Sequence, residues 1–209
     1  MTRPGTSRET WNSRYRDAAL PLFGTAPSEF LRGIVGRSDF DARSALFLAD
    51  GDGRNSRFLA ARGAEVFAID FSRTATEQAR RQDIEAGLSV SRVVADLATW
   101  RGFARRFGAV ILIALHSEEA VRRRTVETGL AEVDDNGWFV LEGFAASQAD
   151  SDTMGPSATE KLYDLSTTLS WIPADFEIYE ALEGRVLLAE GTRHDGPADM
   201  VRILARRRR

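Results

Sequence analysis

The sequence of 209 residues contains no cysteine, only two histidines and a single lysine, Lys161. Without cysteine, disulfide bonds, thiol nucleophiles and thiolate metal sites are excluded. The two histidines, His116 and His194, are too few for a histidine-based zinc site. The sequence therefore predicts no metal centre.

Long hydrophobic runs and a large excess of one charge are also missing. The longest apolar run, residues 109–115, is far shorter than a membrane span and indicates a buried strand. Residues 1–13 are polar and lack the apolar region of a secretory signal. The net charge is -3, and the basic residues 206–209 are expected to form a solvated tail. We expect a cytoplasmic monomer or homodimer that acts on a small-molecule substrate and binds neither nucleic acid nor a membrane.

Length and composition favour a single α/β domain. Hydrophobic residues make up 43% of the chain, enough for one full core. Apolar runs alternate with helical sequence, which predicts a parallel sheet with helices on both faces. Strands are expected at 45–49, 65–69, 90–95, 109–115 and 138–141, with helix caps at Asn55 or Ser56, at Ser72 and at Ser117. Residues 1–43 are expected to form a helical lid over a sheet core of residues 44–209.

The last third of the chain changes character. A helix is expected at 159–170, and strands at 176–182, 186–189 and 200–204. Turn signals separate these elements at Glu183–Gly184 and at 191–197, and another precedes the fifth strand at 134–137. We therefore predict a doubly wound, mostly parallel sheet of seven strands with an antiparallel C-terminal strand near 200–204.

An acidic residue directly follows each of the first three predicted strands. These residues are Asp50, Asp70 and Asp96, and Asp50 begins a glycine turn that contains Gly51 and Gly53. Open α/β sheets bind ligands beyond the carboxyl ends of their strands. Glycines let a ligand approach the backbone, and a carboxylate such as Asp70 can accept ribose hydroxyls. Asp96 could accept a hydrogen bond from an adenine amino group.

The residues around this turn resemble a known family. The stretch ALFLADGDGRNSRFLAARG at 45–63, followed by VFAIDFS at 66–72, is similar to class I S-adenosylmethionine-dependent methyltransferases, which have a Rossmann-like fold. Gly-Arg-Asn-Ser at 53–56 is most similar to the tellurite-resistance and thiopurine methyltransferase-like branch. WNSRY at 11–15 and the segment 190–198 also resemble that branch. The resemblance implies an enzyme that methylates a small molecule, such as a thiol or a reduced sulfur, selenium or tellurium compound.

The resemblance also implies the residues that bind S-adenosyl-L-methionine. They share positions in the glycine turn, at strand ends or in the prefix: Trp11, Arg14, Tyr15, Ala49, Asp50, Gly51, Gly53, Asn55, Asp70, Phe71, Ser72, Asp96, Leu97 and Leu115. This sequence departs from the usual first motif, because Phe47 stands at its acid position and Ala49 at its first glycine. We expect the Asp50 side chain to replace the acid and hold the methionine amino group.

Few residues offer acid–base chemistry. His116 ends the fourth predicted strand and is the candidate catalytic base, although a structural role fits equally well. His194 lies in a glycine-containing stretch and is expected to belong to a local turn. Trp11, Arg14 and Tyr15 are expected to close over the cofactor, with Arg14 pairing its carboxylate. No Asn-Pro-Pro-Tyr or Asp-Pro-Pro-Tyr follows the fourth strand, which argues against methylation of adenine or glutamine amides.

Two other functions remain open at this point. A nicotinamide-dependent oxidoreductase shares the glycine turn and the acid after the second strand. The long prefix and the incomplete Gly-x-Gly-x-x-Gly argue against it. A non-catalytic protein that binds S-adenosylmethionine is the other alternative, since the first motif is altered and bases are scarce.

Overall fold

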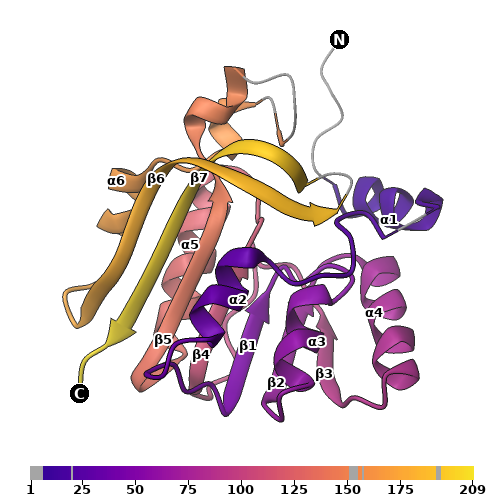
Figure 1. Ribbon diagram of the computed structural model, residues 1–209, viewed down its shortest axis with the longest axis horizontal. Coiled ribbons are helices and arrows are strands. Elements are labelled where there is room, and N and C mark those ends of the chain that lie inside the picture. The colour runs from indigo at the N-terminus through magenta and orange to yellow at the C-terminus, as the bar shows by residue number, and fades with distance from the viewer. Residues whose placement is uncertain (1–6, 20, 151–154, 157, 192–193) are drawn as a thin grey trace.

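A seven-stranded sheet forms the centre of the computed structural model, which describes residues 7–19, 21–150, 155–156, 158–191 and 194–209 (Figure 1). The strand order is β3-β2-β1-β4-β5-β7-β6. The strands are β1 Ser44–Leu48, β2 Glu65–Asp70, β3 Val90–Val94, β4 Phe107–Ile113, β5 Val133–Phe144, β6 Phe176–Gly191 and β7 His194–Arg207. β1 to β5 pair in parallel, whereas β7 is antiparallel to both β5 and β6. The predicted fold and its antiparallel strand at 200–204 are confirmed.

Helices cover both faces of the sheet, because the strands present apolar side chains to both sides. The helices are α1 Arg8–Asp17, α2 Glu29–Val35, α3 Arg54–Ala60, α4 Arg73–Glu85, α5 Glu119–Ala131 and α6 Leu165–Ser170, with short 3-10 turns at Ala146–Asp150 and Thr159–Lys161. One core layer packs α2 and α3 against the sheet, and the other packs α5 and α6 on the opposite face (Figure 1). Within the described ranges, no helix is long and apolar enough to span a membrane.

The hairpin at the end of the sheet differs from the sequence prediction. The expected turn at Glu183–Gly184 is wrong, because β6 continues through it and pairs with β7 along its length, including Gly184 with Met200. Residues 194–197 belong to β7 and not to a turn, while 192–193 lie outside the described residues. Cross-strand hydrogen bonding thus overrides a local turn signal.

Other local predictions also needed tertiary information. Residues 134–137 lie inside β5, where a bulge opposite Gly108 absorbs them and Asn136 takes a left-handed φ of 60°. The helix expected at 159–170 splits into the 3-10 turn and α6. Ser72 caps α4 as predicted, but α3 is capped by Gly53 and α5 by Glu118 instead of the serines or asparagine expected.

Candidate active site

A cavity of about 280 Å³ opens where the strand order reverses, at the carboxyl ends of β1 and β4. Such reversal points are where open α/β sheets bind ligands. Twelve of the residues expected from the sequence line it: Trp11, Tyr15, Ala49, Asp50, Gly51, Asn55, Asp70, Phe71, Asp96, Leu97, Leu115 and His116. Three other expected residues lie outside the cavity wall: Arg14, Gly53 and Ser72. The wall also contains residues that the sequence did not mark as part of the site, among them Phe23, Asp52, Arg54 and His194.

The turn after β1 holds its shape through left-handed backbone. Gly51 and Gly53 have φ of 61° and 84°, and Ala49 has a φ of 56° at the position where the usual motif has glycine. A side chain at Gly51 would collide with the Tyr15 hydroxyl, and one at Gly53 with the Arg92 guanidinium. Both glycines therefore provide conformations and space that other residues cannot. The turn therefore packs closely against Tyr15 on one side and Arg92 on the other.

Asp70 lies at the end of β2 and ties this turn to the next one. Its Oδ2 accepts the Gly51 N–H at 2.9 Å, and its Oδ1 accepts the Ser72 N–H at 2.7 Å. Burial raises the pKa of Asp70 to about 6. The two hydrogen bonds lower this pKa, whereas the nearby charges of Asp50 and Asp52 raise it. The carboxylate is fixed in place and borders the cavity, as a ribose acceptor would need to be.

Asp96 follows β3 and also borders the cavity. Its Oδ1 accepts the Ala98 N–H at 2.9 Å, so the side chain is held by the turn that Leu97 belongs to. Leu97 is buried and packs with the main apolar core. An acid beside an apolar wall is a suitable pair for a purine ring and its amino group.

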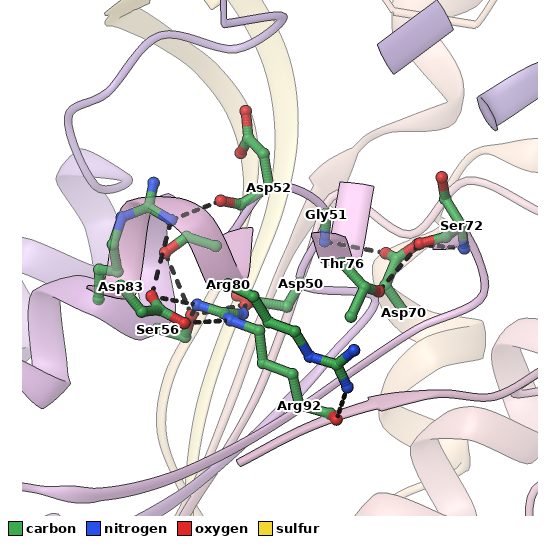
Figure 2. A network of polar contacts seen from close by, with 12 residues as sticks. Asp50, Gly51, Asp52, Ser56, Asp70, Ser72, Thr76, Arg80, Asp83 and Arg92 are labelled. Carbon is green, nitrogen blue, oxygen red and sulfur yellow. Dashed lines mark hydrogen bonds and ion pairs between the residues drawn. The ribbon is translucent and has the colours of Figure 1, made fainter. Parts of the chain in front are cut away.

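Asp50 makes contacts other than those expected from the sequence. Its Oδ2 accepts hydrogen bonds from Ser56 Oγ at 2.5 Å and from Arg92 Nη1 at 2.6 Å (Figure 2). Arg92 also binds Asp83 through Nε at 2.6 Å, and both side chains of that pair are buried. The Asp50 Oδ2 thus belongs to a network that supports the glycine turn, and its Oδ1 is enclosed by the protein without a hydrogen-bond partner. This burial and the ion pair with Arg92 disfavour Asp50 as the amino-group ligand.

The N-terminal helix covers one side of the cavity. Trp11 and Tyr15 both line it, with ring centroids 5.9 Å apart, and Tyr15 is buried. Asn12 Oδ1 accepts a hydrogen bond from Ser72 Oγ at 2.8 Å, which fixes α1 to the start of α4. Arg14 is exposed, and its guanidinium lies 4.8 Å from the centre of the Trp11 ring. Its pairing with a cofactor carboxylate stays a prediction.

His116 is held as a neutral imidazole. Its Nε2 accepts the Phe144 N–H at 3.0 Å, so this nitrogen is not protonated. Burial, with smaller contributions from His194 and Arg122, lowers the pKa of His116 to about 3. A neutral imidazole has one basic nitrogen, and here the Phe144 N–H occupies it, so His116 is poorly suited to remove a proton from a substrate. Of the two roles left open by the sequence, the geometry favours the structural one.

His194 occupies a different environment at the start of β7. Its Nδ1 lies 3.4 Å from Glu190 Oε2, and Glu190 forms a buried ion pair with Arg54 at 2.7 Å. Burial would raise the pKa of Glu190, but the hydrogen bond with His194 and the Arg54 charge hold it lowered, at about 2. In the described part of the chain Nε2 of His194 has no hydrogen-bond partner. A carboxylate that orients one ring nitrogen leaves the other available as a base.

Comparisons with known proteins agree with this geometry. Residues 45–134 match the family described as a methyltransferase domain. One similar structure is described as "Conversion of a Disulfide Bond into a Thioacetal Group during Echinomycin Biosynthesis". Its TM-score is 0.76 at 16% identity, with 96% of this chain and 91% of that chain covered. It also superposes on TehB from Haemophilus influenzae, with a TM-score of 0.67, 14% identity and coverage of 97% of this chain and 68% of that chain.

A third similar structure is the magnesium protoporphyrin IX methyltransferase ChlM from Synechocystis PCC 6803 with bound S-adenosylmethionine. Its TM-score is 0.66 at 16% identity, with 99% of this chain and 100% of that chain covered. At these identities the structures show a shared fold. No curated protein sequence matches the chain.

The fold and the matched domain agree with each other. The chain has the class I methyltransferase fold, and its residues 45–134 match a methyltransferase domain. The site is suited to S-adenosylmethionine, the molecule bound in the ChlM structure, because Gly51 and the acids at the ends of β1, β2 and β3 border one cavity.

Proposed function

We propose that the protein methylates a small molecule through a soft nucleophile, such as a thiol or a reduced selenium or tellurium compound. The observation that carries this proposal is the state of the two imidazoles at the cavity. The basic nitrogen of His116 is occupied by the Phe144 N–H, which leaves His194 as the imidazole with a ring nitrogen, Nε2, that has no hydrogen bond within the described residues. Soft nucleophiles need little help from a base, whereas hydroxyls and amines need more.

The proposed cofactor site uses the residues that line the cavity. Asp70 would accept the ribose hydroxyls, Asp96 the adenine amino group, and the turn at Ala49–Gly51 would hold the amino-acid portion. S-Adenosylmethionine supplies an activated methyl group when bound. The chain contributes alignment of the nucleophile and exclusion of water, for which Trp11, Tyr15 and Phe23 provide apolar walls.

Transfer of radiolabelled methyl groups to a panel of small thiols, selenite, tellurite and phenols tests the substrate class. We expect thiols or reduced chalcogen compounds to accept label and phenols to accept little. Labelling of phenols alone would overturn the choice of nucleophile. Tight binding of S-adenosylhomocysteine without transfer to any acceptor would favour the non-catalytic alternative.

The role of His194 gives a specific prediction. His194→Gln should lower kcat by about 10- to 100-fold for a weakly acidic thiol. This lies at or below the lower end of the roughly 10²–10⁴ that general acid–base catalysis contributes, because a soft nucleophile needs little help from a base. An acidic aromatic thiol, already ionised at neutral pH, should lose less than about threefold, since no proton needs to be removed. Initial rates with both thiols measure the difference. Equal losses for the two thiols would show that His194 acts only through packing on Phe23.

The lid gives a second prediction. Removing residues 1–19 should weaken binding of S-adenosylhomocysteine by about tenfold or more, since one buried aromatic side chain contributes about 1.5–3 kcal/mol. Calorimetric titration checks this, with circular dichroism to confirm folding. Arg14→Ala separates the charge from the rings, because Arg14 is exposed and touches Trp11. A truncated protein that binds at full affinity would show that α1 is not a lid.

A further inference from the structure

We propose that Asp52 holds the α-ammonium group of S-adenosylmethionine, in place of the acid that the usual class I motif carries six residues before Gly53. This inference rests on the cofactor site proposed above. It assigns a role to a residue that the sequence motif does not mark and whose position in the turn differs from that of the usual acid.

The acid position itself has no carboxylate in this chain. Phe47 occupies it, is 2% exposed, and packs in the apolar layer with Phe30 and Leu59. Asp50, the nearest acid in the sequence, gives its Oδ2 to Arg92 and Ser56, and its unpaired Oδ1 is enclosed by the protein, out of reach of a ligand in the cavity. The ammonium group therefore needs another partner near the turn.

Asp52 has the properties of such a partner. It lines the cavity and is only 4% exposed. Within the described ranges its carboxylate has no hydrogen bond and no ion pair with another residue, although its backbone carbonyl accepts Arg57 Nη1 at 2.6 Å. Figure 2 shows the carboxylate pointing away from the network around Asp50, Asp83 and Arg92. A buried carboxylate without a donor is costly, and a bound cation would relieve that cost.

The surrounding charges leave Asp52 available. Burial raises its pKa, Arg57 lowers it, and Asp50 raises it further. Arg57 approaches the Asp52 backbone carbonyl and lies 4.0 Å from Asp83, so its guanidinium is directed to other oxygens. Both oxygens of Asp70 already accept backbone N–H groups. Of Asp50, Asp52 and Asp70, Asp52 alone has a carboxylate that accepts no hydrogen bond from another described residue.

Calorimetric titration of two ligands tests the assignment. S-Adenosylhomocysteine carries the ammonium group, and 5′-methylthioadenosine lacks the whole amino-acid portion. Asp52→Asn should weaken S-adenosylhomocysteine about 10- to 100-fold, the effect of losing a charged hydrogen bond. It should change the affinity for 5′-methylthioadenosine by less than about twofold. Unchanged binding of S-adenosylhomocysteine, or equal losses for both ligands, would overturn the role of Asp52.

The midpoint of thermal unfolding without ligand shows whether the Asp52 carboxylate stabilises the fold. If its role were structural, replacing it would lower this midpoint. Asp52→Asn should leave the midpoint at or above the wild-type value, because the carboxylate has no hydrogen bond or ion pair with another described residue to lose. Asp50→Asn is the matched control in the same turn, and it should lower the midpoint by weakening its contact with Arg92. A lower midpoint for Asp52→Asn would contradict the inference. Failure of the wild-type protein to bind S-adenosylhomocysteine would instead contradict the proposed cofactor site.

Discussion

Asp70→Ala is expected to weaken binding of S-adenosylhomocysteine by about 2–4 kcal/mol, or roughly 30- to 700-fold. The substitution removes the carboxylate that borders the cavity and accepts the N–H groups of Gly51 and Ser72. Both the acceptor for the ribose hydroxyls and the fixed position of the glycine turn are lost. Calorimetric titration measures the change. An unchanged dissociation constant would remove Asp70 from the proposed site.

The pH dependence of the same residue provides a second measurement. Because burial raises the pKa of Asp70 from 3.8 to about 6, the folded state binds its proton more tightly than the unfolded state does. Stability without ligand should therefore rise as the pH falls from about 7 to about 5. Affinity for S-adenosylhomocysteine should fall over the same range, since the acceptor becomes protonated. In Asp70→Asn, both the stability and the affinity should vary less with pH. If the variant and the wild type showed the same pH dependence, Asp70 would not be the group that titrates.

Arg92→Met is expected to lower the free energy of unfolding by about 3–5 kcal/mol, because it leaves buried carboxylates without their cation. Arg92 binds Asp50 and Asp83 at 2.6 Å each, and its Nη2 lies 3.0 Å from Ser56 Oγ. The side chains of all three charged residues are at most 6% exposed. Solvent screening is therefore weak, and the loss should approach the value for a buried network.

Urea-induced unfolding measures that loss. Arg123→Met is the matched control, since Arg123 pairs with Glu127 at 2.8 Å on the exposed face of α5. An exposed pair of this spacing contributes about 0.3–0.5 kcal/mol, so the control should stay close to the wild type. Similar losses for both variants would mean that Arg92 acts through its aliphatic packing and not through the buried charges.

The sequence was sufficient to predict most of the sheet. β1, β2, β3 and β4 are short apolar runs bounded by glycines or acids, a pattern that local sequence carries directly. β6 was split in the prediction because Glu183–Gly184 resembles a turn. What keeps that segment extended is its pairing with β7, which is a contact between distant residues. The bulge at 134–137 escaped prediction for the same reason.

The candidate site also contains residues that the sequence predicted and contacts that it did not. Asp70 and Asp96 were predicted because strand ends converge at one edge of a parallel sheet. The partners of Asp50 were not, since Arg92 and Asp83 stand 42 and 33 positions further along the chain and only the fold brings them under the turn. The environments of His116 and His194 also depend on distant residues, so their roles could not be assigned from local sequence.

The position of β7 also constrains the order in which the chain can fold during translation. β7 lies between β5 and β6 in the sheet, yet the ribosome makes it after both. A nascent chain that has reached only β6 therefore has neither of the ladders that β7 provides, and the edge of β5 is open. β1 to β5, with the acids of the cavity, can pair during synthesis, whereas His194 joins the cavity wall only when the hairpin closes.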